Sequence, residues 1–140
     1  MYEAQNLKAQ VLLSPQTVTD GATATANLDT LGADYATIVV NYAAEESTFA
    51  VDSTLSLLHA DDTEVTSFAT VTANLSQDLA SAKVVMYHVD LRGKKRYLRL
   101  SHTSGTETGG NITLGAMAYL SRNSADPAST SDMADQVVIV

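Results

Sequence analysis

Apolar and polar residues alternate along much of the chain with a period of two. Residues 22–28, 84–91 and 111–120 each place apolar side chains at every second position. Successive side chains of an extended strand point to opposite faces, so this alternation predicts β-strands with one buried face. A pattern compatible with a helix, of about two turns, occurs at residues 76–83. We therefore expect an all-β protein.

One predicted strand is apolar on both faces. In residues 35–42, YATIVVNY, Ile38 and Val40 fall on one face and Val39 falls on the other. A strand that is apolar on both faces is typical of the middle of a sheet, where both sides are covered. We therefore place this segment at the centre of its sheet.

The other predicted strands are shorter or weaker. The pattern predicts strands at 54–59, 65–71 and 96–103, and a weak first strand at 9–13 that ends at Pro15. About eight short strands separated by turn residues are typical of a β-sandwich or jelly roll.

The expected fold is an all-β, two-sheet antiparallel sandwich of jelly-roll type. It spans residues 1–120 and is followed by a polar strap and a flexible, apolar carboxyl-terminal arm at 121–140. A single domain of this length buries roughly two thirds of its unfolded surface, which is enough for a sizeable core. The expected core residues are Leu28, Ile38, Val40, Leu57, Phe68, Val85, Tyr87, Val89, Leu98, Leu100, Ile112 and Leu114.

Composition excludes several classes of protein. The chain has no cysteine, which excludes disulfide frameworks, thiolate metal sites and cysteine nucleophiles. Its net charge of −8 disfavours nucleic-acid binding, which requires basic side chains facing phosphates. The first residues lack the basic and then apolar pattern of a secretory signal, and no apolar run approaches the roughly 18 residues of a membrane span. We expect neither a nucleic-acid nor a membrane partner.

Titratable residues do not form a recognisable catalytic motif. His59, His88 and His102 all fall in predicted strands, and no two of them have the spacing that places two imidazoles on one metal ion. The acidic turn at 61–64 lacks the spacing and the glycine of an EF-hand loop. We therefore expect no enzymatic activity, no cofactor and no metal site.

Basic side chains are concentrated in one segment. Five of the eight lysines and arginines lie within eight positions, and we call them the basic turn: Arg92, Lys94, Lys95, Arg96 and Arg99. They can form a positive patch that docks on an acidic partner. They can equally be solvated side chains of a hairpin turn around Gly93, where charge also deters unwanted strand pairing. The sequence leaves both interpretations open.

The chain ends on four apolar residues that follow a polar segment at 121–136. Val137, Val138, Ile139 and Val140 have high strand propensity, and an isolated strand of this kind is prone to aggregate in water. We expect the tail to add to the edge of a partner's sheet. The alternative is that the tail folds back as an edge strand of its own sandwich.

Three segments, taken in order, resemble a known group of proteins. Residues 93–122, GKKRYLRLSHTSGTETGGNITLGAMAYLSR, resemble small tailed-phage virion proteins encoded near the major capsid protein. In that group a GxxRYVRV strand leads through a Thr/Ser/Gly turn into GGxxSAxVxxG. The amino half is also similar, in Pro15-Gln16-Thr17 and in the segments NLDTLGADYATIVVNY (27–42) and LSLLHADDTEVTSF (55–68), so the resemblance covers roughly residues 10–122. The group usually has Asp-Gly where this chain has Asp-Asp-Thr at 61–63.

The resemblance implies a capsid decoration, or cement, protein on the outer surface of a phage virion. Its partner is then the major capsid protein, and the basic turn and the tail are the candidate contact sites. A homotrimer is the expected oligomer, because shells offer threefold sites and repeated contacts add avidity.

Two other functions stay open. The segment RYLRL (96–100) also resembles a strand of discoidin-like and carbohydrate-binding sandwiches, which implies a carbohydrate- or host-binding module on a virion. Sugar-binding surfaces usually present exposed aromatic rings. The chain has no tryptophan, so Tyr42, Tyr87 and Tyr97 are the strand-borne candidates. The other possibility is a hydrolase whose site has no recognisable motif.

Overall fold

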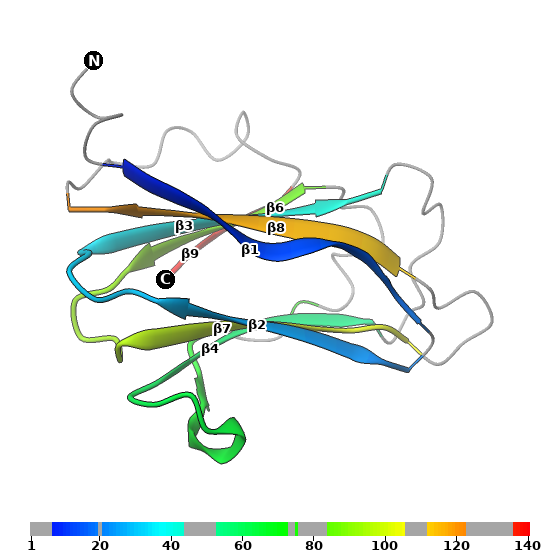
Figure 1. The fold of residues 1–140 in the computed structure, drawn as a ribbon, viewed down its shortest axis with the longest axis horizontal. Helices are drawn as coiled ribbons and strands as arrows, with labels where there is room; N and C mark the ends of the chain where they lie inside the picture. Colours follow the sequence, from blue (N-terminus) through cyan, green and yellow to red (C-terminus); the bar gives the residue numbers. More distant parts are fainter. Residues whose placement is uncertain are drawn as a thin grey trace.

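The computed structural model describes residues 7–19, 21–43, 53–72, 75, 84–105, 112–122 and 136–140. These residues form two facing layers of β-strands (Figure 1). The five-stranded sheet has the order β1 (Leu7–Val18), β8 (Ile112–Ser121), β3 (Tyr35–Tyr42), β6 (Val84–Asp90) and β9 (Gln136–Ile139). The four-stranded sheet has the order β2 (Thr23–Asp29), β7 (Tyr97–Thr103), β4 (Thr54–Ala60) and β5 (Ala69–Thr70).

The strand pairing defines a jelly roll. β1 pairs with β8, β2 with β7, β3 with β6 and β4 with β5, all antiparallel. These are the pairs of one long hairpin whose tip lies between β4 and β5. Rolling that hairpin places β3 beside β8 and β4 beside β7, which completes the two sheets. The predicted two-sheet jelly roll is confirmed, and β3 is the middle strand of its sheet as predicted.

The core lies between the sheets and consists of alternate strand residues. Every predicted core residue except Phe68 is buried. Phe68 is only half-buried, on the outside of the four-stranded sheet, where the Arg99 guanidinium lies 3.7 Å from its ring centre. The predicted strand at 65–71 is wrong, because Val65–Ser67 form a 3₁₀ turn (η2) and only Ala69–Thr70 pair as β5. Alternation therefore does not apply to this segment.

β1 is longer than predicted, because it continues through Pro15 instead of ending there. Pro15 is tolerated because β1 is an edge strand, where one side of the backbone needs no ladder partner. The pairing with β8 also shifts register on both sides of Leu13. Gly115 on β8 leaves room for the proline, since a Cβ atom at this position would lie 3.3 Å from Pro15 Cγ.

The carboxyl-terminal residues form a ninth strand of the same molecule. β9 runs parallel to β6 at the edge of the five-stranded sheet (Figure 1). The Val140 N–H donates to the His88 carbonyl, and the Asp90 N–H donates to the Val140 carbonyl, both at 2.9 Å. Val138 and Val140 pack against the core. The structure therefore has the alternative arrangement, an edge strand of the chain's own sandwich, and not the expected addition to a partner's sheet, because the edge of β6 provides the backbone partners.

Two predicted segments fall outside the described residues. They are the short helix at 76–83 and, from residue 123 to residue 135, the polar strap. Leu75 is described, and it forms an isolated antiparallel bridge with Leu55. In the part of the chain that the structure describes, no helix is long and apolar enough to span a lipid bilayer.

Candidate interaction surfaces

The basic turn connects β6 to β7 at one end of the sandwich. The Lys94 N–H donates to the Leu91 carbonyl at 3.0 Å, which closes the turn. Gly93 has a φ of +81°, in the left-handed region that side-chain-bearing residues rarely adopt. The turn that the sequence predicts around Gly93 is therefore present.

Three of the five basic side chains are paired with carboxylates of the same chain. The pairs, with their shortest nitrogen–oxygen distances, are Arg92–Asp90 (2.6 Å), Arg96–Asp29 (2.7 Å) and Lys95–Asp61 (3.4 Å). The hydrogen bond from Arg96 lowers the pKa of Asp29 to about 2, and that from Arg92 lowers the pKa of Asp90 to about 2. Exposed pairs of this kind add little stability. Their main effect is to neutralise most of the local positive charge.

The charges of Arg99 and Lys94 are not neutralised by a carboxylate of the described residues. Arg99 Nε donates to Asn27 Oδ1 at 2.8 Å, and its guanidinium covers the Phe68 ring, but these partners are neutral. For Lys94, the described residues provide no carboxylate within ion-pair distance. The basic turn therefore offers less free positive charge than its sequence indicates.

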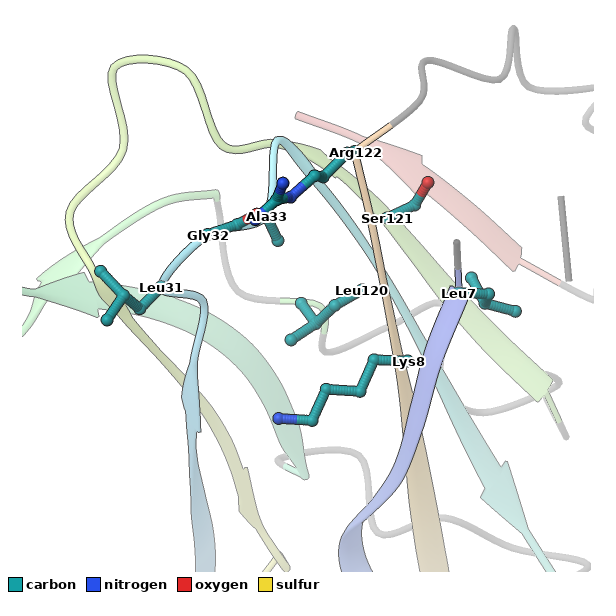
Figure 2. Close-up of a pocket in the computed structure, with 8 residues that line it drawn as sticks. All are labelled: Leu7, Lys8, Leu31, Gly32, Ala33, Leu120, Ser121 and Arg122. Atoms are coloured by element: carbon teal, nitrogen blue, oxygen red, sulfur yellow. The ribbon is translucent and has the colours of Figure 1, made fainter. Parts of the chain in front are cut away.

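A groove opens between the start of β1, the end of β8 and the β2–β3 turn (Figure 2). Its volume is about 330 Å³, and its apolar lining includes Leu7, Leu31 and Leu120. Lys8 and Arg122 supply two positive charges, and neither has an ion-pair partner among the described residues. Leu31, on the turn, is 73% exposed. Local sequence does not predict this groove, because its lining comes from three distant segments.

Two rows on the outer face of the four-stranded sheet are hydrophilic, whereas Leu58 and Phe68 lie farther along the same face. Two rows in register across β2, β7 and β4 are Thr23–Thr103–Thr54 and Thr25–Ser101–Ser56. The Thr23 and Thr103 hydroxyl groups are 2.9 Å apart and share a hydrogen bond. Hydroxyl rows of this kind are typical of a sheet face in contact with water.

The outer face of the five-stranded sheet has the opposite character. Two rows in register cross its five strands: Val11–Met117–Val39–Met86–Val137 and Ala9–Tyr119–Thr37–His88–Ile139. We call these two rows the apolar face. Val11 and Ile139, at its two edges, are 59% and 56% exposed. Among the charged side chains in the described strands of this sheet, Asp90 points outward. It lies beyond the end of the two rows and is paired with Arg92.

His102 is part of a buried polar network at the other end of the sandwich. Its Nδ1 lies 3.3 Å from the Tyr42 hydroxyl and its Nε2 lies 3.3 Å from Ser104 Oγ. Ser104 Oγ in turn donates to the Val18 carbonyl at 3.1 Å. Burial lowers the pKa of His102 to about 4, so its imidazole is neutral near pH 7. Neither Ser104 nor His102 is accessible to solvent, so the serine and the histidine do not face a substrate. The network links the two sheets through the Tyr42–His102 and Ser104–Val18 contacts.

The other two histidines lie in strands, as predicted. His88 Nδ1 is 3.1 Å from Thr37 Oγ1, and burial lowers the pKa of His88. His59 Nδ1 accepts the Lys95 backbone N–H at 3.2 Å, and burial together with the nearby lysines lowers the pKa of His59. Nowhere in the described ranges do three or more His, Cys, Asp or Glu side chains gather as a metal site requires.

The tyrosines that were candidates for sugar stacking are mostly inside. Tyr42 is 5% exposed and Tyr87 is fully buried in the core, as predicted for Tyr87, so neither ring is available to a ligand. Both residues belong to the inward-facing set of their strands. Tyr97 is half-buried, with the Arg96 guanidinium 4.9 Å from its ring centre.

Comparisons with known proteins give one distant structural likeness to report. No family model matches the chain, and no curated protein matches it in sequence. The chain is similar to a chain in the structure of infectious bursal disease virus, Gx strain, with a TM-score of 0.40 and 12% sequence identity. The match covers 86% of this chain and 33% of that chain, so this chain spans about a third of its length. A likeness at this TM-score carries no argument about function.

Proposed function

We propose that this chain is a non-enzymatic structural component of a virus particle. More specifically, it is a decoration, or cement, protein that binds the outer surface of a phage capsid and stabilises the shell. The three ordered sequence segments support this proposal. Jelly rolls occur in viral capsid domains but also in lectins and cupins, so the fold is compatible with the proposal without deciding it.

The unequal outer faces of the two sheets carry the proposal. A protein bound to a shell needs one surface for contact and another for water. The hydroxyl rows of the four-stranded sheet suit solvent, whereas the valines and methionines of the apolar face suit a protein contact. A net charge of −8 keeps free copies soluble before they bind.

The partner in this proposal is the major capsid protein. The surplus charges of Lys94 and Arg99, and those of Lys8 and Arg122 in the groove, favour an acidic contact on the shell. The homotrimer expected from shell symmetry stays a prediction. The tail pairs with β6 of its own chain. Its outward residues, Val137 and Ile139, can therefore contact the major capsid protein. We do not propose sugar binding, because two of its three candidate rings are buried.

Co-sedimentation with capsids tests this function. Capsids of the virus that encodes the chain are prepared without it, and the purified protein is added at increasing concentration. We expect saturable binding in a fixed ratio to the capsid subunits, and a higher temperature of capsid disruption. A double variant, Lys94→Glu with Arg99→Glu, should bind more weakly at low salt. Lack of binding by the parent chain would contradict the proposal.

A further inference from the structure

We infer that the apolar face is a self-association surface, through which two copies of this chain pack face to face about a two-fold axis. The inference concerns the free protein and does not rest on the proposed function. Because it uses the face assigned above to the shell, dimerisation and binding to the shell exclude each other. Two opposing sheets in this arrangement pack about 10 Å apart with their strands within roughly 30° of each other.

The composition of the apolar face suits contact with a protein better than contact with water. Its first row has only valine and methionine side chains, one from each of the five strands. Methionine adapts its shape to an opposing surface because its side chain is unbranched and flexible. Two outward rows of the other sheet are threonine and serine. Solvent exposure alone would not produce this difference between two sheets of one domain.

The first row is symmetric about its centre, which favours a second copy as the occupant. It reads Val–Met–Val–Met–Val, with Val39 on the middle strand. A two-fold axis along β3 places Val39 opposite itself and Met117 of one copy opposite Met86 of the other. The edge residues Val11 and Val137 then also face each other. A two-fold interface requires this self-complementarity, because the same patch serves both copies.

Charge also favours self-association through this face. Each chain has a net charge of −8, so two copies repel each other through most approaches. The two rows contain no carboxylate, lysine or arginine, and the lowered pKa of His88 keeps its imidazole neutral near pH 7. Contact through the apolar face therefore brings no like charges close together.

The size of the face predicts a weak dimer. Five strands about 4.8 Å apart, with two rows that span about 13 Å along the strands, give roughly 320 Å² per copy and roughly 640 Å² in total. This total lies below the range of stable specific interfaces, among weak and transient contacts. We therefore expect a dissociation constant in the high micromolar range.

The tail explains the full width of this face. β9 supplies Val137 and Ile139 to the two rows, while Val138 and Val140 point to the core. Both faces of β9 therefore carry apolar side chains, one towards the core and one on the apolar face. Without β9 the face would be one strand narrower, and Val11 would lose its symmetric counterpart.

Sedimentation velocity of the full chain over roughly 1–300 µM tests the inference. We expect a monomer–dimer equilibrium that does not weaken between low and high salt, because the contact is uncharged. Val39→Asp should raise the dissociation constant at least about tenfold, which is about 1.4 kcal/mol. The matched control Thr25→Asp, on the outer face of the other sheet, should leave it within about twofold.

A second variant covers the possibility that Val39→Asp disturbs folding. Ile139→Asp changes a side chain that is already 56% exposed, so it should weaken the dimer while leaving the melting temperature nearly unchanged. Three results would overturn the inference. They are a monomer at every concentration, a trimer, and equal effects of the apolar-face variants and the Thr25 control.

Discussion

The Tyr42 hydroxyl lies 3.3 Å from Nδ1 of His102, and this contact joins the two sheets through the core. Tyr42 belongs to β3 of the five-stranded sheet, and His102 belongs to β7 of the four-stranded sheet. The rings are tilted by 59° with their centres 5.7 Å apart. A buried polar link of this kind is stabilising only while both partners are present.

Removal of the Tyr42 hydroxyl should therefore destabilise the domain. Tyr42→Phe leaves the buried Nδ1 of His102 without this partner, which should lower the free energy of unfolding by about 1–2 kcal/mol. Urea denaturation measures the change. Tyr97→Phe is the matched control, because Tyr97 is half-buried at the sheet surface, and it should cost less than about 0.5 kcal/mol. Equal effects of the two variants would argue against the inter-sheet link.

Stability should fall as the pH is lowered from about 6.5 to about 4. The pKa of His102 is lowered to about 4 by burial, whereas in the unfolded chain it is near 6.5. Within this window the unfolded state binds the proton and the folded state does not, so protonation favours unfolding. The loss for His102 is at most ~3 kcal/mol and levels off below pH 4.

Nuclear magnetic resonance of the imidazole carbons measures this pKa directly. We expect His102 to titrate well below the ordinary range of histidine. His59 and His88 should also titrate below 6.5, because burial lowers the pKa of each. A His102 titration above pH 6 would show that its ring is hydrated or paired with an acid.

The two faces of the tail strand should respond differently to a charge. Val138 packs against the core, so Val138→Asp should lower the free energy of unfolding by about 2 kcal/mol or more. Ile139 points outward and is 56% exposed, so Ile139→Asp should change the free energy of unfolding by less than about 0.5 kcal/mol. Thermal and urea unfolding compare the variants. If the tail instead left its own domain, both substitutions would leave monomer stability unchanged.

The ion pair between Arg96 and Asp29 should be visible in the titration of the carboxyl group. Arg96→Leu removes the hydrogen bonds that lower the pKa of Asp29 to about 2, so this pKa should rise towards its ordinary value of 3.8. Lys94→Leu, in the same turn, should leave it almost unchanged. An unchanged Asp29 titration in the Arg96 variant would show that the pair does not persist in solution.

The alternation of residues was sufficient to predict most of the sandwich. Inward residues such as Ile38 and Leu100 follow from period two alone, because each lies in a regular strand with one face towards the core. Phe68 shows where this reasoning fails. Its segment alternates like a strand, but a 3₁₀ turn changes the direction of its side chains. Local sequence does not distinguish these two arrangements.

Candidate contact sites were harder to predict, because their properties depend on distant residues. Arg96 has Asp29 as its partner only because β2 pairs with β7, and local sequence gives no measure of that register. The apolar face was missed for a similar reason. Its rows combine side chains from five strands, and single outward residues such as Met86 and Met117 carry little signal alone.

A cryo-electron microscopy map of purified particles tests the central claim most directly. The particles are those of the virus whose genome encodes this chain. We predict density for a two-sheet jelly roll of 140 residues on the outer surface of the capsid, at regular positions of the lattice. Particles without this density, confirmed by mass spectrometry that does not detect the chain in the purified virions, would contradict the proposal.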